Sequence, residues 1–97
     1  MILIVQNRIQ VNKGFEDRFE QDLPRSERAE VPGRLFFALL RSDDPGVYIN
    51  NSVWGSRAAF QDWRGSDAFK RAHSGGPPEG AVACRPELIV AEVVYSD

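Results

Sequence analysis

Three side chains in this sequence could together act on a bound ligand: the Asn7 amide, the Trp63 indole and the His73 imidazole. His73 is the only histidine, and a neutral imidazole is a common axial or metal ligand. It lies four residues after Phe69, on the same face of an expected helix and just before a Gly-rich break. Trp63 follows Phe60 by three residues and offers a large apolar wall. These types suit a pocket for a flat apolar cofactor.

Each of these residues also has a purely structural explanation. An asparagine in a strand often bonds to nearby backbone, and a tryptophan at helical spacing usually belongs to the core. A single histidine near a helix C-terminus complements the helix dipole. Residue type and spacing alone therefore leave the function open.

The first element to position these residues is a strand expected over Ile2–Val11. Alternation puts Asn7 on one face with four apolar residues, namely Leu3, Val5, Ile9 and Val11. An unpartnered buried amide costs about 1–3 kcal/mol. We therefore expect Asn7 either to bond internally or to face a cavity.

The remaining pattern predicts the order β-α-β-β-α-β, which is typical of a ferredoxin-like fold of the α+β class. Its antiparallel sheet should carry the helices on one face, in one domain over residues 1–97. Turn residues separate the elements at 42–46 and 74–80. The expected elements are a helix with Phe15, Phe19 and Leu23, strands Arg34–Arg41 and Val47–Trp54, a helix capped by Ser56 with Ala58, Ala59, Phe60 and Trp63, a short helix from Ser66 and Asp67 with Phe69, Ala72 and His73, and a strand over Leu88–Tyr95.

The second and fourth expected strands are apolar on both faces. Helices can cover only one of these faces, and so much apolar surface is seldom left in water. We therefore expect a homodimer in which two sheets pack together as a dimeric αβ barrel.

Composition and missing motifs exclude several classes of function. The chain carries 12 basic against 14 acidic residues, a net charge of −2, without a basic stripe, so nucleic acid is not an expected partner. The sequence has no glycine-rich nucleotide motif and no apolar run long enough for a membrane span. Its single cysteine, Cys84, is assigned to structure, as is Trp54, and a cytoplasmic location is expected.

Two segments, residues 5–14 and 51–73, resemble the IsdG-type haem-degrading monooxygenases. These enzymes belong to the antibiotic-biosynthesis-monooxygenase-like group of dimeric ferredoxin-like proteins. The V-W-x-S-x-x-A-F-x-x-W portion is shared widely in that group and supports the fold. The combination of N-R after the first half-strand, W-x-x-S-x-x-F and A-H resembles the haem-degrading members.

The resemblance implies a role for each residue. His73 matches the proximal ligand of haem iron, Asn7 the amide that hydrogen-bonds near the iron-bound oxygen, and Trp63 the bulky residue that distorts the macrocycle. Phe69 is expected to line the haem site. Haem would be both substrate and cofactor, with O2 as co-substrate and electrons from a separate reductase.

Two alternatives share this fold. One is a cofactor-independent monooxygenase that acts on a quinol or a polyketide-like aromatic substrate and does not need His73. The other is a non-catalytic dimer that stores or delivers haem, because fold alone does not define function.

Overall fold

The structure is a computed structural model that describes residues 1–26, 31–73, 80, 82–83 and 86–97, and the side chains of 22–26 and 71–73 lie outside the described part. Its seven elements run in the expected order, with the second helical segment split in two. They are β1 (Leu3–Gln10), α1 (Glu16–Ser26), β2 (Arg34–Arg41), β3 (Val47–Trp54), α2 (Arg57–Arg64), α3 (Asp67–His73) and β4 (Glu87–Glu92).

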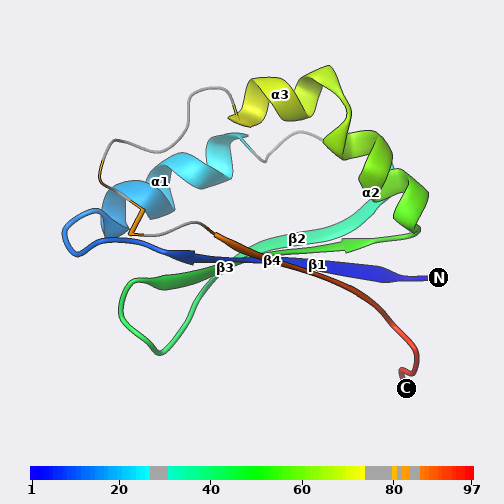
Figure 1. The fold of residues 1–97 in the computed structure, drawn as a ribbon, viewed down its shortest axis with the longest axis horizontal. Coiled ribbons are helices and arrows are strands. Elements are labelled where there is room, and N and C mark those ends of the chain that lie inside the picture. Colours follow the sequence, from blue (N-terminus) through cyan, green and yellow to red (C-terminus); the bar gives the residue numbers. More distant parts are fainter. Residues whose placement is uncertain (27–30, 74–79, 81, 84–85) are drawn as a thin grey trace.

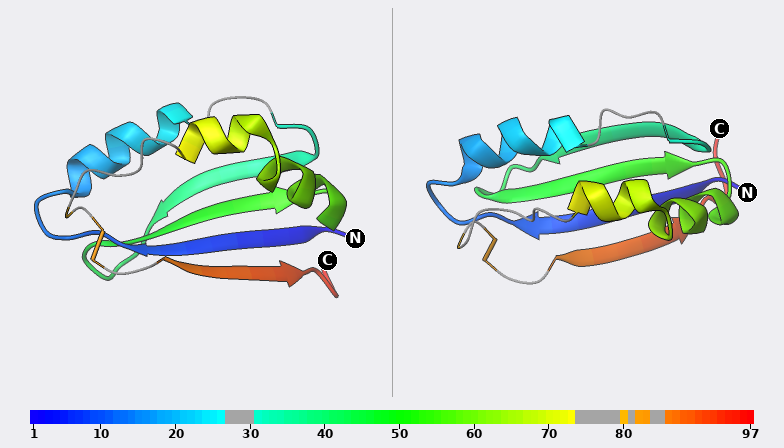
Figure 2. Two further views of the ribbon diagram at one scale, coloured as in Figure 1. Left: turned by 45° about the horizontal axis from the view of Figure 1, so that its top comes forward. Right: turned by 90° about the horizontal axis from the view of Figure 1, so that it is seen from above.

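The four strands form one antiparallel sheet in the order β2-β3-β1-β4. All three helices lie on the same side of this sheet (Figure 1). Viewed from above, α1 lies over one end of the sheet and α2 over the other, with α3 between them (Figure 2). The ferredoxin-like α+β prediction is confirmed.

The ends of two strands differ from the prediction. The last strand ends at Glu92 rather than Tyr95 because its partner β1 begins at Leu3, and the Val93 N–H makes a final bond to the Ile2 carbonyl at 2.9 Å. The first strand ends at Gln10, and Val11 continues only as an isolated bridge to Val82.

Local sequence explains the break between α2 and α3. The Ser56 hydroxyl accepts from the Ala59 N–H at 3.1 Å and caps α2, which ends at Arg64 with Gly65 as its C-cap. Ser66 then begins α3, because its hydroxyl accepts from the Phe69 N–H at 3.1 Å. The two helices can therefore change direction within two residues.

The helix-covered face of the sheet carries two separate apolar clusters. One centres on the fully buried Trp54 beneath α2, and the other on Tyr48 beneath α1. The buried members are Leu3, Val5, Trp54 and Phe60 in the first cluster, and Ile9, Val11 and Tyr48 in the second. The strand positions between them on this face are occupied by Asn7 of β1 and Asn50 of β3.

The opposite face of the sheet is open in the single chain. It exposes Phe36, Leu40 and Ile89 by 56%, 41% and 52%, alongside Ile49 and Val53. Large apolar side chains on three strands therefore lie on this face without a covering layer among the described residues.

Candidate functional site

Trp63 and Phe69 meet at the junction of α2 and α3. Their rings contact edge to face, with centroids 5.6 Å apart and planes at 89°. The junction itself is tied by Ser66, whose hydroxyl donates to the Trp63 carbonyl at 2.7 Å. Such a pair is worth about 0.5–1.5 kcal/mol beyond burial, so it orients both rings.

Trp63 also packs against the apolar cluster that contains Leu3 and Val5. Val5 and Asn7 share the helix-covered face of β1, two residues apart. The Trp63–Phe69 pair therefore packs on the cluster that contains Val5, and Asn7 is the next residue of β1 on the same face.

Asn7 occupies the middle of β1, where the register places it opposite Asn50 on β3 and Leu88 on β4. Leu88 shares its face with Val90, which packs on the cluster beneath α2, yet Leu88 is 47% exposed. The helix layer therefore leaves apolar sheet surface uncovered beside Asn7.

The structure describes the side chains of Asn7, Trp63 and Phe69 but not that of His73. Trp63 and Phe69 are in direct contact, and Asn7 lies on the helix-covered face as expected. His73 is the last residue of α3, whose C-terminal end lies over the middle of the sheet in Figure 2, but its side chain lies outside the described part. Its role as an iron ligand stays a prediction, as do the roles of Asn7, Trp63 and Phe69. The Gly-rich loop at 74–79 and Cys84 also lie outside the described residues.

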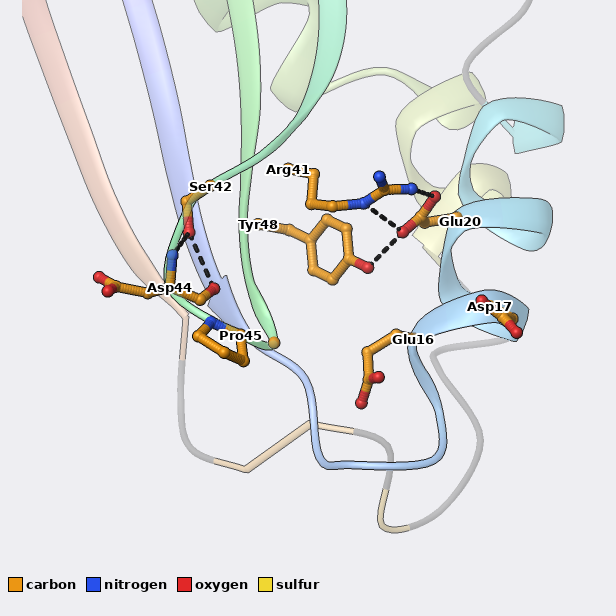
Figure 3. A pocket seen from close by; sticks show the side chains of 9 residues that line it. Glu16, Asp17, Glu20, Arg41, Ser42, Asp44, Pro45 and Tyr48 are labelled. Carbon is orange, nitrogen blue, oxygen red and sulfur yellow. Dashed lines mark hydrogen bonds and ion pairs between the residues drawn. The ribbon is translucent and has the colours of Figure 1, made fainter.

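A second feature, not anticipated from the sequence, is a polar cavity of about 390 Å³ between α1 and the β2–β3 turn (Figure 3). In Figure 3 the side chains of Arg41 (β2) and Tyr48 (β3) extend from the sheet toward the carboxylate of Glu20 on α1. The Arg41 Nε donates to Glu20 at 2.9 Å, and the Tyr48 hydroxyl donates to the same carboxylate. The lining residues are Glu16, Asp17, Glu20, Arg41, Ser42, Asp44, Pro45, Gly46 and Tyr48.

Burial and these contacts shift the pKa values of all three side chains. The Arg41 hydrogen bond lowers the pKa of Glu20, with help from Tyr48. Burial, followed by the bond to Glu20, raises the pKa of Tyr48 above its ordinary value, and the Glu20 carboxylate raises that of Arg41. The trio fastens α1 to the sheet edge, and its acidic surroundings do not suit a flat apolar ligand.

Among the described residues, no cluster of three or more histidine, cysteine or acidic side chains is arranged to hold a metal ion. Likewise, none of the helices in the described ranges is long and apolar enough to cross a membrane.

The sheet order and the one-sided helix layer define a ferredoxin-like protein of the α+β class. Residues 2–75 match the antibiotic biosynthesis monooxygenase family. The chain belongs to this family, and the resemblance inferred from residues 5–14 and 51–73 is confirmed at that level.

Curated relatives of the chain are haem-degrading enzymes. A haem oxygenase (staphylobilin-producing) from Staphylococcus saprophyticus is 34% identical over 76 residues, covering 74% of this chain and 73% of the relative. A haem-degrading monooxygenase from Listeria welshimeri is 33% identical over 84 residues, covering 74% and 69%. The solved structure of the haem degrader MhuD from Mycobacterium tuberculosis, with two haems bound in its active site, matches with a TM-score of 0.77 at 28% identity, covering 98% of both chains.

The Glu20 trio predicts a pH dependence of stability. Because the folded pKa of Glu20 lies below its ordinary value of 4.5, the carboxylate stabilises the fold fully above that pH, and this contribution is lost as the pH falls through the lowered value. Urea unfolding should show Glu20→Gln less stable than wild type at pH 7, with the difference shrinking as the pH falls below 4.5. The exposed Asp62→Asn serves as control, and a Glu20→Gln deficit that grows as the pH falls below 4.5 would contradict the assignment.

Proposed function

We propose that this protein is a haem-degrading monooxygenase that binds haem between its helices and its sheet and opens the porphyrin ring oxidatively, which releases iron. The observation that carries the proposal is the half-exposed Leu88 beside Asn7 on the helix-covered face, together with the Trp63–Phe69 pair, which packs on the apolar cluster farther along the same face. Membership of the monooxygenase family and the haem-degrading relatives support it.

The described residues fit a large, flat, apolar ligand with a polar centre. Leu88 is about half exposed on a face that is otherwise covered by helices, and Leu39 of β2 flanks the same region. Trp63 and Phe69 supply aromatic surface above this floor. Covering these groups with porphyrin would bury apolar area that the helix layer leaves open, at about 25 cal/mol per Å².

Each residue then has a distinct part in the reaction. His73, at the end of α3, would hold haem iron through a neutral imidazole. Haem bound in this way would supply the iron chemistry that activates dioxygen. From the sheet side, the Asn7 amide would donate one hydrogen bond to the oxygen co-substrate. The apolar side chains of the sheet would limit the access of water.

Trp63 acts by position. Its indole contacts Phe69 and also packs against the cluster of Leu3 and Val5, and both contacts restrict its movement when a ligand binds. Trp63 would therefore press on a porphyrin bound here and distort it, which would position the ring for its own oxidation. Electrons would come from a separate reductase or a chemical reductant.

The open face of the sheet supports a homodimer as part of the same proposal. Phe36, Leu40 and Ile89 form an apolar surface that a second copy can cover, sheet against sheet. Each subunit would then keep its own helix layer and its own haem site on the outer side.

Light scattering tests the dimer. Wild type should run at about twice the chain mass of 10.9 kDa, and Phe36→Glu should shift it toward the single mass because a buried unpaired carboxylate is costly. Gln61→Glu on the outer face of α2 is the matched control. Wild type at the single mass at micromolar concentration would refute the homodimer.

Haemin titration followed by visible absorbance tests the proposed function. Wild type should give a Soret band that saturates near one haem per subunit and then decays, with iron release, after ascorbate is added in air with catalase present. His73→Ala should lose the ligand spectrum. Trp63→Ala should bind haemin but turn it over at least about tenfold more slowly, because the distortion is lost.

The other outcomes discriminate between the functions that this fold can carry. A stable Soret band that does not decay under reductant and oxygen would favour a haem carrier. Absence of a saturable band would refute haem as substrate, and oxygen consumption by metal-free protein with a quinol would then identify a cofactor-independent monooxygenase. An unchanged spectrum and rate in His73→Ala would refute the assigned ligand.

A further inference from the structure

We propose that Asn50 is a second polar binding residue of the haem site and that it acts together with Asn7 on a small ligand at the centre of the site. This inference rests on the proposed function. It assigns a role to a β3 residue that lies 43 positions from Asn7 in the sequence and has no counterpart in the motifs that indicated haem chemistry.

The strand register places the two amides side by side. Asn7 and Asn50 are direct partners in the antiparallel β1–β3 ladder, where opposed Cβ atoms lie about 4.5–5.5 Å apart. Asn50 lies on the same face of β3 as Tyr48 and Ser52, which are two residues away on either side and are buried beneath the helices. Both amides therefore belong to the floor beneath the helices.

One step along the same ladder provides an internal comparison. Gln6 and Asn51 are also direct partners, on the open face of the sheet, and the Gln6 Nε2 donates to the Asn51 Oδ1 at 3.1 Å. Asn7 and Asn50, by contrast, make no side-chain hydrogen bond to any residue in the described part of the chain.

Asn7 and Asn50 are both half-buried, and the described part of the chain contains no fully buried side-chain polar atom without a partner. Their side-chain amide atoms are therefore at least partly accessible, and each amide offers two N–H donors.

The two amides also lie in the middle of a row of four side chains that has a leucine at each end. The register runs across the sheet from Leu39 of β2 through Asn50 and Asn7 to Leu88 of β4. A leucine on each side and two donors in the middle match a porphyrin, which has an apolar rim and a polar centre at the metal. Donors at that centre can bind a small anion or polar molecule held by the iron.

The test uses ferric haem complexes titrated with azide, followed by visible absorbance. Asn50→Leu removes the donors at similar volume, and azide affinity should fall about three- to tenfold, as expected for one lost hydrogen bond. The dissociation constant of haemin should change less than about threefold. Asn51→Leu, the same substitution one residue along β3 on the open face, should keep wild-type azide affinity.

Asn50→Asp provides a second reading if the leucine variant does not fold. It keeps the size and loses both donors, so azide affinity should again fall. Azide affinity within about twofold of wild type in either folded variant would overturn the role of Asn50. Failure of the proposed function would look different, because wild type itself would then show no saturable Soret band. In that case the inference about Asn50 would be refuted together with the proposed function.

Discussion

The antiparallel pairing of β1 with β3 determines which side chains face the helices and which face away, and the site depends on it. In the observed register Asn7 lies opposite Asn50 beneath the helix layer, while Gln6 and Asn51 pair on the open face. Because the side-chain period of a strand is two, a slip of one residue would exchange these pairs and turn the apolar clusters outward. The same alignment that builds the core therefore places at its centre two amides that have no side-chain hydrogen bond within the described part of the chain.

Two asparagines between the apolar clusters reduce the apolar burial at the middle of the sheet. The two ends of the sheet offset this loss separately. At one end α2 covers Trp54, whose Nε1 donates to the Ser52 hydroxyl at 2.9 Å inside the buried cluster. At the other end α1 packs on Tyr48 and is fastened by the Glu20–Arg41 ion pair. With each cluster anchored by its own helix, the middle of the floor can remain open without loss of the fold.

Much of this architecture follows from local sequence. Alternation in the first strand, the turn residues at 42–46, and the helix signals at Ser56, Gly65 and Ser66 led to the correct element order and to the split between the two later helices. The face of Asn7 also followed from alternation, because period two is a local property. The end of β4 was misjudged because it is set by where β1 starts, which the apolar run VVY does not reveal.

The parts of the site that could not be predicted are those created by distant pairing. Asn50 stood in the sequence as one of two adjacent asparagines, and only the strand register distinguishes it from Asn51, which faces the other way and is already bonded. The Glu20–Arg41–Tyr48 contacts join three elements in the same manner. The partnership between Trp63 and Phe69 was nearer to prediction, since one short helix break separates them.

The most direct measurement of the central claim is the nitrogen–proton NMR spectrum of the side-chain amides with and without gallium protoporphyrin, a diamagnetic haem analogue. Ring currents act over a short range, so binding on the helix side should shift the Asn7 and Asn50 amide signals strongly. The Gln6 and Asn51 signals, from the other face of the same ladder, should stay in place. Saturable binding that moves Gln6 and Asn51 but leaves Asn7 and Asn50 unchanged would contradict a haem site on this floor.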